Sequence, residues 1–131
     1  MKRILLIEDN DLNLKLLKSI LNLGGYDTLH APDAETGIGM AHEHLPDLIF
    51  MDINLPGMGG LEATRLLKAD KLSRDIPIIA LTSHAMNGDE KRAINAGCSA
   101  YITKPINTRT FLTDIEPYVA DSGNDAESIR P

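Results

Sequence analysis

Cysteine is almost absent from the sequence, since Cys98 is the single one among 131 residues. One thiol excludes a disulfide framework within the chain and fits a protein of a reducing compartment. Long apolar runs are absent too, and none approaches the roughly 20 residues that a membrane-spanning helix needs. We also recognise no signal peptide in the sequence. These absences predict a cytoplasmic protein.

Positive charge is also scarce, because 13 lysines and arginines face 19 aspartates and glutamates, for a net charge of −6. Nonspecific binding to nucleic acid needs a basic patch, and binding to a membrane surface needs a basic amphipathic helix. The acidic balance argues against both kinds of partner. The length predicts one domain over residues 1–119, with no DNA-reading or catalytic domain after it. The polar, acidic segment 120–131 is expected to be a flexible tail.

Short apolar runs alternate with helical patterns along the chain. The apolar runs predict strands at 3–7, 26–30, 46–51, 76–81 and 100–103. The segments between and after them predict helices at 11–23, 33–43, 60–70, 87–96 and 107–118. Alternation of this kind is typical of βαβ units, so we expect an α/β fold with a mainly parallel sheet and helices on both faces.

The apolar residues of the helical segments indicate how each helix packs. In the first segment, the stripe predicted to face the core comprises Leu12, Leu16, Ile20 and Leu23, widened by Leu17 and Leu21. The fourth segment has mostly small apolar residues, so little buried area anchors it and we expect it to be movable. Pro117 interrupts the fifth segment and should kink or shorten its last turn.

Functional side chains stand where four of the predicted strands end. They are Glu8, Asp9, Asp52, Thr82 and Lys104. Because the carboxyl ends of parallel strands share one edge, these side chains should meet around one crevice. Three close carboxylates need compensating positive charge, which a lysine and a divalent cation supply; magnesium suits such a site. Asp52 would then be the nucleophile toward a phosphoryl group, with Lys104 and magnesium neutralising its charge and Thr82 donating a hydrogen bond.

The motifs around these residues carry a resemblance that covers about residues 1–119. They are Ile7-Glu8-Asp9-Asn10, Met51-Asp52-Ile53-Asn54-Leu55-Pro56, Met86-Asn87-Gly88-Asp89-Glu90 and Lys104-Pro105-Ile106. With these motifs in this order, the chain resembles the receiver domain of response regulators in two-component signalling. Within that family it resembles the stand-alone regulators of the DivK type. The resemblance implies a flavodoxin-like, CheY-like (βα)5 doubly wound sheet of five parallel strands in the order 2-1-3-4-5.

The resemblance also implies how a phosphoryl group is taken up. Asp52 would be the phosphoacceptor, receiving the group from a phosphohistidine on a sensor histidine kinase or a histidine phosphotransfer protein. Magnesium would be bound by the carboxylates of Asp9 and Asp52, by the backbone carbonyl of Asn54, and by Glu8 through a water molecule. Lys104 would pair with the phosphoryl group. Beyond phosphotransfer and its own dephosphorylation, the protein would not act as an enzyme.

A second group of residues would transmit the signal. Thr82 would move toward the phosphoryl group, Tyr101 would swing inward behind it, and Pro105 would follow a cis peptide bond. Asn54 and His84 flank the site and would tune dephosphorylation. The response would appear on the surface of helix four, strand five and helix five, which would contact a downstream protein. The chain would act as a monomer or as a phosphorylation-dependent homodimer, in cell-cycle or developmental control.

Two other functions compete with this interpretation. A phosphatase of the haloacid dehalogenase type also uses an aspartate nucleophile and magnesium, but it needs a second aspartate two residues later, where this chain has Asn54. A receiver-like module that binds partners without phosphate would not need the intact set of site residues. Locally, Glu8, Asp9 or Asn10 could instead serve as caps of the first helix.

Overall fold

The computed structural model describes residues 2–55, 57–82 and 88–120. Five parallel strands form one sheet: β1 (Arg3–Ile7), β2 (Asp27–Ala31), β3 (Leu48–Asp52), β4 (Ile78–Thr82) and β5 (Ala100–Thr103). Their order across the sheet is β2-β1-β3-β4-β5, which confirms the predicted fold class and strand order. Every residue of β3 and β4 is buried, as strands covered on both faces require.

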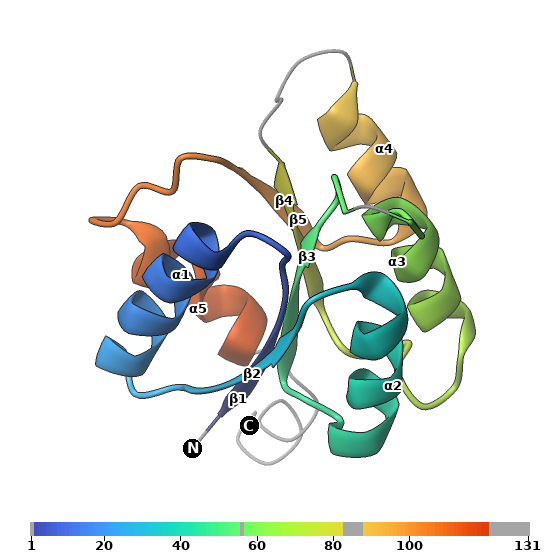
Figure 1. Ribbon diagram of the computed structural model, residues 1–131, viewed down its shortest axis with the longest axis horizontal. Helices are drawn as coiled ribbons and strands as arrows, with labels where there is room; N and C mark the ends of the chain where they lie inside the picture. Colours follow the sequence, from blue (N-terminus) through green and yellow to red (C-terminus); the bar gives the residue numbers. More distant parts are fainter. Residues whose placement is uncertain (1, 56, 83–87, 121–131) are drawn as a thin grey trace, which may run out of the picture.

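Helices cover both faces of this sheet. They are α1 (Asp11–Leu23), α2 (Ala34–His44), α3 (Gly60–Ala69), α4 (Asp89–Ala96) and α5 (Phe111–Ala120). In Figure 1, α1 and α5 lie on one side of the sheet, and α2, α3 and α4 lie on the other. Successive side chains of a strand point to opposite faces of the sheet. Leu5 therefore belongs to the core under α2 and α3, whereas Leu6 belongs to the core under α1 and α5. In the described part of the chain, no helix has the length and apolar character needed to cross a membrane.

The buried face of α1 differs from the predicted stripe. Leu17, Ile20 and Leu21 are buried, whereas the predicted core residues Leu12, Leu16 and Leu23 are 77%, 39% and 86% exposed. The prediction placed Leu17 and Leu21 at the margin of the stripe, but they lie at its centre. Leucines surround more than half of this helix, so periodicity alone could not determine which part of the apolar surface faces the sheet.

Helix α5 departs from the prediction at both ends. It begins at Phe111 rather than at 107, because a turn precedes it in which the Asn107 carboxamide accepts a hydrogen bond from the Arg109 backbone N–H at 3.0 Å. It continues three residues beyond Pro117, so the expected shortening of its last turn is wrong. Pro117 removes one N–H from the helix. The buried side chains of Ile115 and Val119, on either side of the proline, keep the helix on the sheet.

Helix α4 is the shortest helix, with eight residues. Both of its flanking residues, Gly88 and Gly97, have positive φ angles of 81° and 119°. Its buried side chains are those of Asp89, Ala93 and Ala96. Two alanine methyl groups supply little apolar burial, which agrees with the expectation that few contacts anchor this helix.

Candidate functional site

Three carboxylates gather at the carboxyl ends of β1 and β3, which are neighbours in the sheet. Glu8, Asp9 and Asp52 each place one oxygen so that the three oxygens lie within 4.8 Å of one another. Glu8 and Asp52 are buried, with 1% and 4% of their surface exposed, whereas Asp9 is exposed. The cluster therefore reaches from the edge of the core to solvent.

Lys104 supplies the positive charge of the cluster. Its Nζ lies 3.1 Å from Oε1 of Glu8 and 3.3 Å from Oδ2 of Asp52. The residue follows β5, and its backbone N–H donates to the carbonyl of Thr82 at 2.7 Å, which ties the ends of β5 and β4 together. The Lys104–Pro105 peptide bond is cis, the isomer that the resemblance implied.

The two loops that carry the acids orient them with backbone N–H groups. The N–H of Asn10 donates to Oε2 of Glu8 at 3.2 Å, and the N–H of Asn54 donates to Oδ1 of Asp52 at 2.9 Å. Asn10 is the N-cap of α1, since its side chain accepts from the N–H of Asn13 at 3.0 Å. Glu8 and Asp9 are therefore not needed as caps, and their charges face the cluster.

Glu8 is under electrostatic strain in the absence of a cation. Burial, followed by the adjacent Asp52 carboxylate, raises the pKa of Glu8 above its usual range, while Lys104 acts in the opposite direction. Its Oε1 is close to Lys104, yet no group in the described part of the chain makes a hydrogen bond to this buried oxygen. Three carboxylates with one lysine and one orphaned oxygen form a donor set that fits a hard divalent cation.

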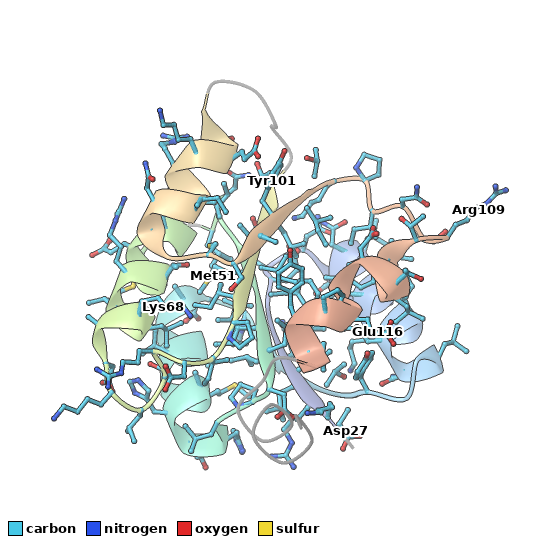
Figure 2. All side chains as sticks on the ribbon, turned by 180° about the vertical axis from the view of Figure 1, so that it is seen from behind. Asp27, Met51, Lys68, Tyr101, Arg109 and Glu116 are labelled. Atoms are coloured by element: carbon cyan, nitrogen blue, oxygen red, sulfur yellow. The ribbon has the colours of Figure 1, made fainter. Side chains whose placement is uncertain are left out.

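Thr82 and Tyr101 are directed away from the acids. Thr82 is buried at the end of β4, and its hydroxyl donates to Oδ2 of Asp89 in α4 at 3.4 Å. Tyr101 in β5 is half-buried and lies beside α4 (Figure 2). The carboxylate of Glu90 accepts from its phenol and raises the pKa of Tyr101. The structure thus brings Glu8, Asp9, Asp52 and Lys104 together, with Thr82 and Tyr101 turned to α4; His84 lies outside the described residues.

Two residues of this region were missed by the sequence prediction. Gly60, the first residue of α3, packs directly on the end of β3, where an added Cβ would lie 2.4 Å from the carbonyl oxygen of Asp52. The sequence predicted only that a helix begins at this glycine. Asp89 was noted only as part of the motif Met86-Asn87-Gly88-Asp89-Glu90, and its contact with Thr82 depends on tertiary packing.

Comparison with known proteins identifies the class to which this fold and site belong. A family model for the response regulator receiver domain matches residues 4–116. The chain therefore belongs to the receiver domain family of response regulators in two-component signalling, and the predicted family is confirmed.

Individual relatives show which members of the family the chain is similar to. The chain is 45% identical over 121 residues to the polar-differentiation response regulator DivK of Brucella ovis, which covers 92% of this chain and 98% of DivK. It is 32% identical to the receiver domain of the sensor histidine kinase PA1611 from Pseudomonas aeruginosa, whose structure has a magnesium ion in the active site cleft; 92% of this chain and 98% of that one are covered, with a TM-score of 0.85. The chemotaxis protein CheY4 of Vibrio cholerae shares the fold, with a TM-score of 0.84 at 23% identity over 90% of this chain and 98% of CheY4.

Proposed function

We propose that this protein is a phosphorylation-dependent switch in which Asp52 accepts a phosphoryl group from a phosphohistidine on a sensor kinase or a phosphotransfer protein. The observation that carries this proposal is the position of Asp52. Its carboxylate lies at the end of a buried strand, 3.3 Å from Lys104 Nζ and beside two further acids. A structural carboxylate would need neither the additional acids nor a partly buried lysine.

The contacts of Asp52 suit a nucleophile. Oδ1 accepts the backbone N–H of Asn54 and Oδ2 faces Lys104, so the carboxylate is held in one orientation. In the transfer, one Asp52 oxygen forms a bond to phosphorus while the bond from phosphorus to the imidazole nitrogen breaks. The electron pair stays on that nitrogen, which takes up a proton. Lys104 neutralises part of the charge on the transferred oxygens, and the Thr82 hydroxyl donates a hydrogen bond to one of them.

The same residues would hold a magnesium ion. Asp9 and Asp52 would bind it by their carboxylates, Asn54 by its backbone carbonyl, and Glu8 through a water molecule. The orphaned Oε1 of Glu8 and its raised pKa support this assignment, because both are relieved by a cation. Bound there, magnesium supplies positive charge that stabilises the oxygens of the phosphoryl group.

The output of the switch would be a protein contact. Phosphorylation adds about −1.5 to −2 charges at neutral pH, next to the carbonyl end of β4 and to Lys104. Thr82 and Tyr101 contact the first turn of α4, so their movement would alter the surface formed by α4, β5 and α5. The similarity to DivK, which is 45% identical over an alignment that covers 98% of its length, supports a role in cell-cycle or developmental control. Asn54 and His84 would set the rate of dephosphorylation.

Intact-mass measurement tests the acceptor. The wild-type protein, Asp52→Asn and Asp27→Asn are incubated with acetyl phosphate and magnesium chloride, and also with phosphoramidate, which presents a phosphorus–nitrogen bond. Wild type and Asp27→Asn should gain one phosphoryl adduct, whereas Asp52→Asn should gain none. Asp27 is a matched control, because it is an exposed aspartate at the opposite end of the sheet (Figure 2).

Three outcomes would contradict the proposal. An adduct of equal yield on Asp52→Asn would place the acceptor elsewhere. If folded wild-type protein gains no adduct from either donor in the presence of magnesium, the result would favour a binding module that works unphosphorylated. Continuous release of phosphate from a simple phosphomonoester would instead favour the phosphatase interpretation.

A further inference from the structure

Asp89 is a buried carboxylate outside the acidic cluster. It is the first residue of α4 and only 6% exposed, so a residue that usually lies in solvent has its charge inside the fold. In the described part of the chain, two groups contact its carboxylate. Oδ2 accepts the hydroxyl of Thr82 at 3.4 Å, and Oδ1 forms an ion pair with the guanidinium of Arg92, one turn further along the helix.

The hydroxyl of Thr82 has one hydrogen and can donate it to one acceptor at a time. Among the residues that the structure describes, its acceptor is Asp89, whereas under the proposed function it is an oxygen of the phosphoryl group on Asp52. The two arrangements exclude each other. The backbone of Thr82 is held by the N–H of Lys104 on its carbonyl, so the exchange of acceptors takes place by movement of the side chain.

We propose that Asp89 is a positioning residue that holds Thr82 in the unphosphorylated arrangement, and that it competes directly with the phosphoryl group for the threonine hydroxyl. When the hydroxyl leaves, the carboxylate of Asp89 remains buried with one partner fewer. A buried charge that loses a hydrogen bond is unfavourable, so the first turn of α4 shifts to return Asp89 to water. This inference rests on the proposed role of Asp52.

Other contacts of α4 favour such a shift. The helix is short, and the apolar side chains that it buries are the methyl groups of Ala93 and Ala96. Glu90, the residue after Asp89, accepts a hydrogen bond from the phenol of Tyr101. The first two residues of α4 thus each contact one of the two residues predicted to transmit the signal. Release of Asp89 would free the adjacent Glu90–Tyr101 contact along with it.

A double-mutant cycle tests the competition. The dissociation constant of beryllofluoride, which mimics a phosphoryl group on an aspartate, is measured with magnesium by calorimetry for wild type, Asp89→Ala, Thr82→Val and the double variant. Without its competitor, Asp89→Ala should bind beryllofluoride roughly tenfold more tightly than wild type. In the Thr82→Val background, Asp89→Ala should have no effect, because the hydroxyl for which they compete is gone.

Glu62→Ala is the matched control. Glu62 is an exposed acid in the first turn of α3, so its removal changes the charge at a helix N-terminus without touching Thr82. It should leave the affinity for beryllofluoride unchanged. A gain for Glu62→Ala equal to that for Asp89→Ala would reduce the effect to net charge and overturn the inference. The inference would also be overturned if Asp89→Ala raised the affinity for beryllofluoride as much in the Thr82→Val background as in wild type.

A measurement on the wild-type protein tests the inference whether or not the variants fold. The ¹³C resonance of the Asp89 carboxyl group should shift when beryllofluoride is added to wild type, and the shift should be much smaller in Thr82→Val, which has no hydroxyl to exchange between the two acceptors. An unchanged resonance in wild type at saturating beryllofluoride would overturn the inference. Wild type that fails to bind beryllofluoride at all would instead refute the proposed role of Asp52, so the two failures are distinguishable.

Discussion

Glu8 is a side chain whose burial opposes its ionisation. Burial and the Asp52 carboxylate raise the pKa of Glu8 above its reference value of 4.5. A group whose pKa is higher in the folded than in the unfolded state stabilises the fold fully below the unfolded pKa, and this contribution is lost as the pH rises through the folded pKa. At neutral pH the ionised Glu8 therefore lowers stability unless a cation binds.

Replacement of Glu8 by glutamine should separate stability from ion binding. Without magnesium at neutral pH, we expect Glu8→Gln to raise the free energy of unfolding by about 1 kcal/mol, because it removes charge repulsion from a strained site. With magnesium, the further stabilisation seen for wild type should largely disappear. Thermal unfolding with a chelator and with magnesium chloride measures both effects. Glu35→Gln, at an exposed acid in the first turn of α2, should change neither; a metal-free loss of stability in Glu8→Gln would contradict the prediction.

At the scale of elements, the approach of α3 to β3 positions the candidate acceptor. Helix α3 begins at Gly60, and a Cβ there would lie 2.4 Å from the carbonyl oxygen of Asp52 and 2.7 Å from Cα of Ile53. Both atoms belong to the backbone, so neither can rotate away. The start of the helix can reach this position only because residue 60 has no side chain.

Gly60→Ala should therefore move the end of β3. We expect a loss of about 1–3 kcal/mol in the free energy of unfolding, the usual range for overpacking, and a slower gain of phosphoryl adduct on Asp52. Gly39→Ala is the control, because Gly39 lies in α2 with open space around it, and alanine there should stabilise by up to about 1 kcal/mol. Urea unfolding and the time course of adduct formation measure the two effects. Equal stability for Gly60→Ala and wild type would show that the backbone can yield.

The elements themselves were largely predictable from the sequence. Alternating apolar runs and amphipathic segments indicated all five strands and all five helices, and the strand order came from the family resemblance. The buried face of α1 was not predictable, because leucines surround much of the helix and packing against the sheet selects Leu17 and Leu21. The start of α5 depends on a side-chain turn at Asn107, and its passage through Pro117 depends on the burial of Ile115 and Val119.

At the scale of the whole molecule, two cores on opposite faces of one sheet hold the strand ends in register. Phe50 of β3 stacks on Phe111 of α5 with ring centroids 5.4 Å apart, which links the central strand to the last helix. Val119 is the last buried core residue that the structure describes. The predicted domain of residues 1–119 therefore includes the side chains that close the core under α1 and α5.

Truncation tests this boundary. A chain that ends after Ala120 should unfold within about 0.5 kcal/mol of the full chain and take up phosphoryl groups equally well. A chain that ends after Glu116 also lacks Tyr118 and Val119, which pack in the core under α1 and α5, and should lose about 2–4 kcal/mol. Urea unfolding and intact mass measure both. A large loss of stability in the longer truncation would place part of the domain beyond residue 120.

The strand topology predicted which residues of the site lie close together, but it did not predict how their side chains are oriented. The rule that parallel strands end at one edge was sufficient to bring Glu8, Asp9, Asp52 and Lys104 together. It gave no information about the rotation of a side chain at that edge. Thr82 was expected to face the acids, yet its hydroxyl donates to Asp89, an acceptor that the first turn of α4 supplies.

The position of Tyr101 also makes the protein its own optical probe. The chain has no tryptophan and only three tyrosines. Tyr26 and Tyr118 pack against the core under α1 and α5, while Tyr101 packs against the opposite core, beside α4 (Figure 2). A phenol that donates to a carboxylate emits differently from one in an apolar setting. Changes in ultraviolet emission therefore report on α4 in unlabelled protein, and substitution of Tyr101 by phenylalanine identifies which part of the signal originates there.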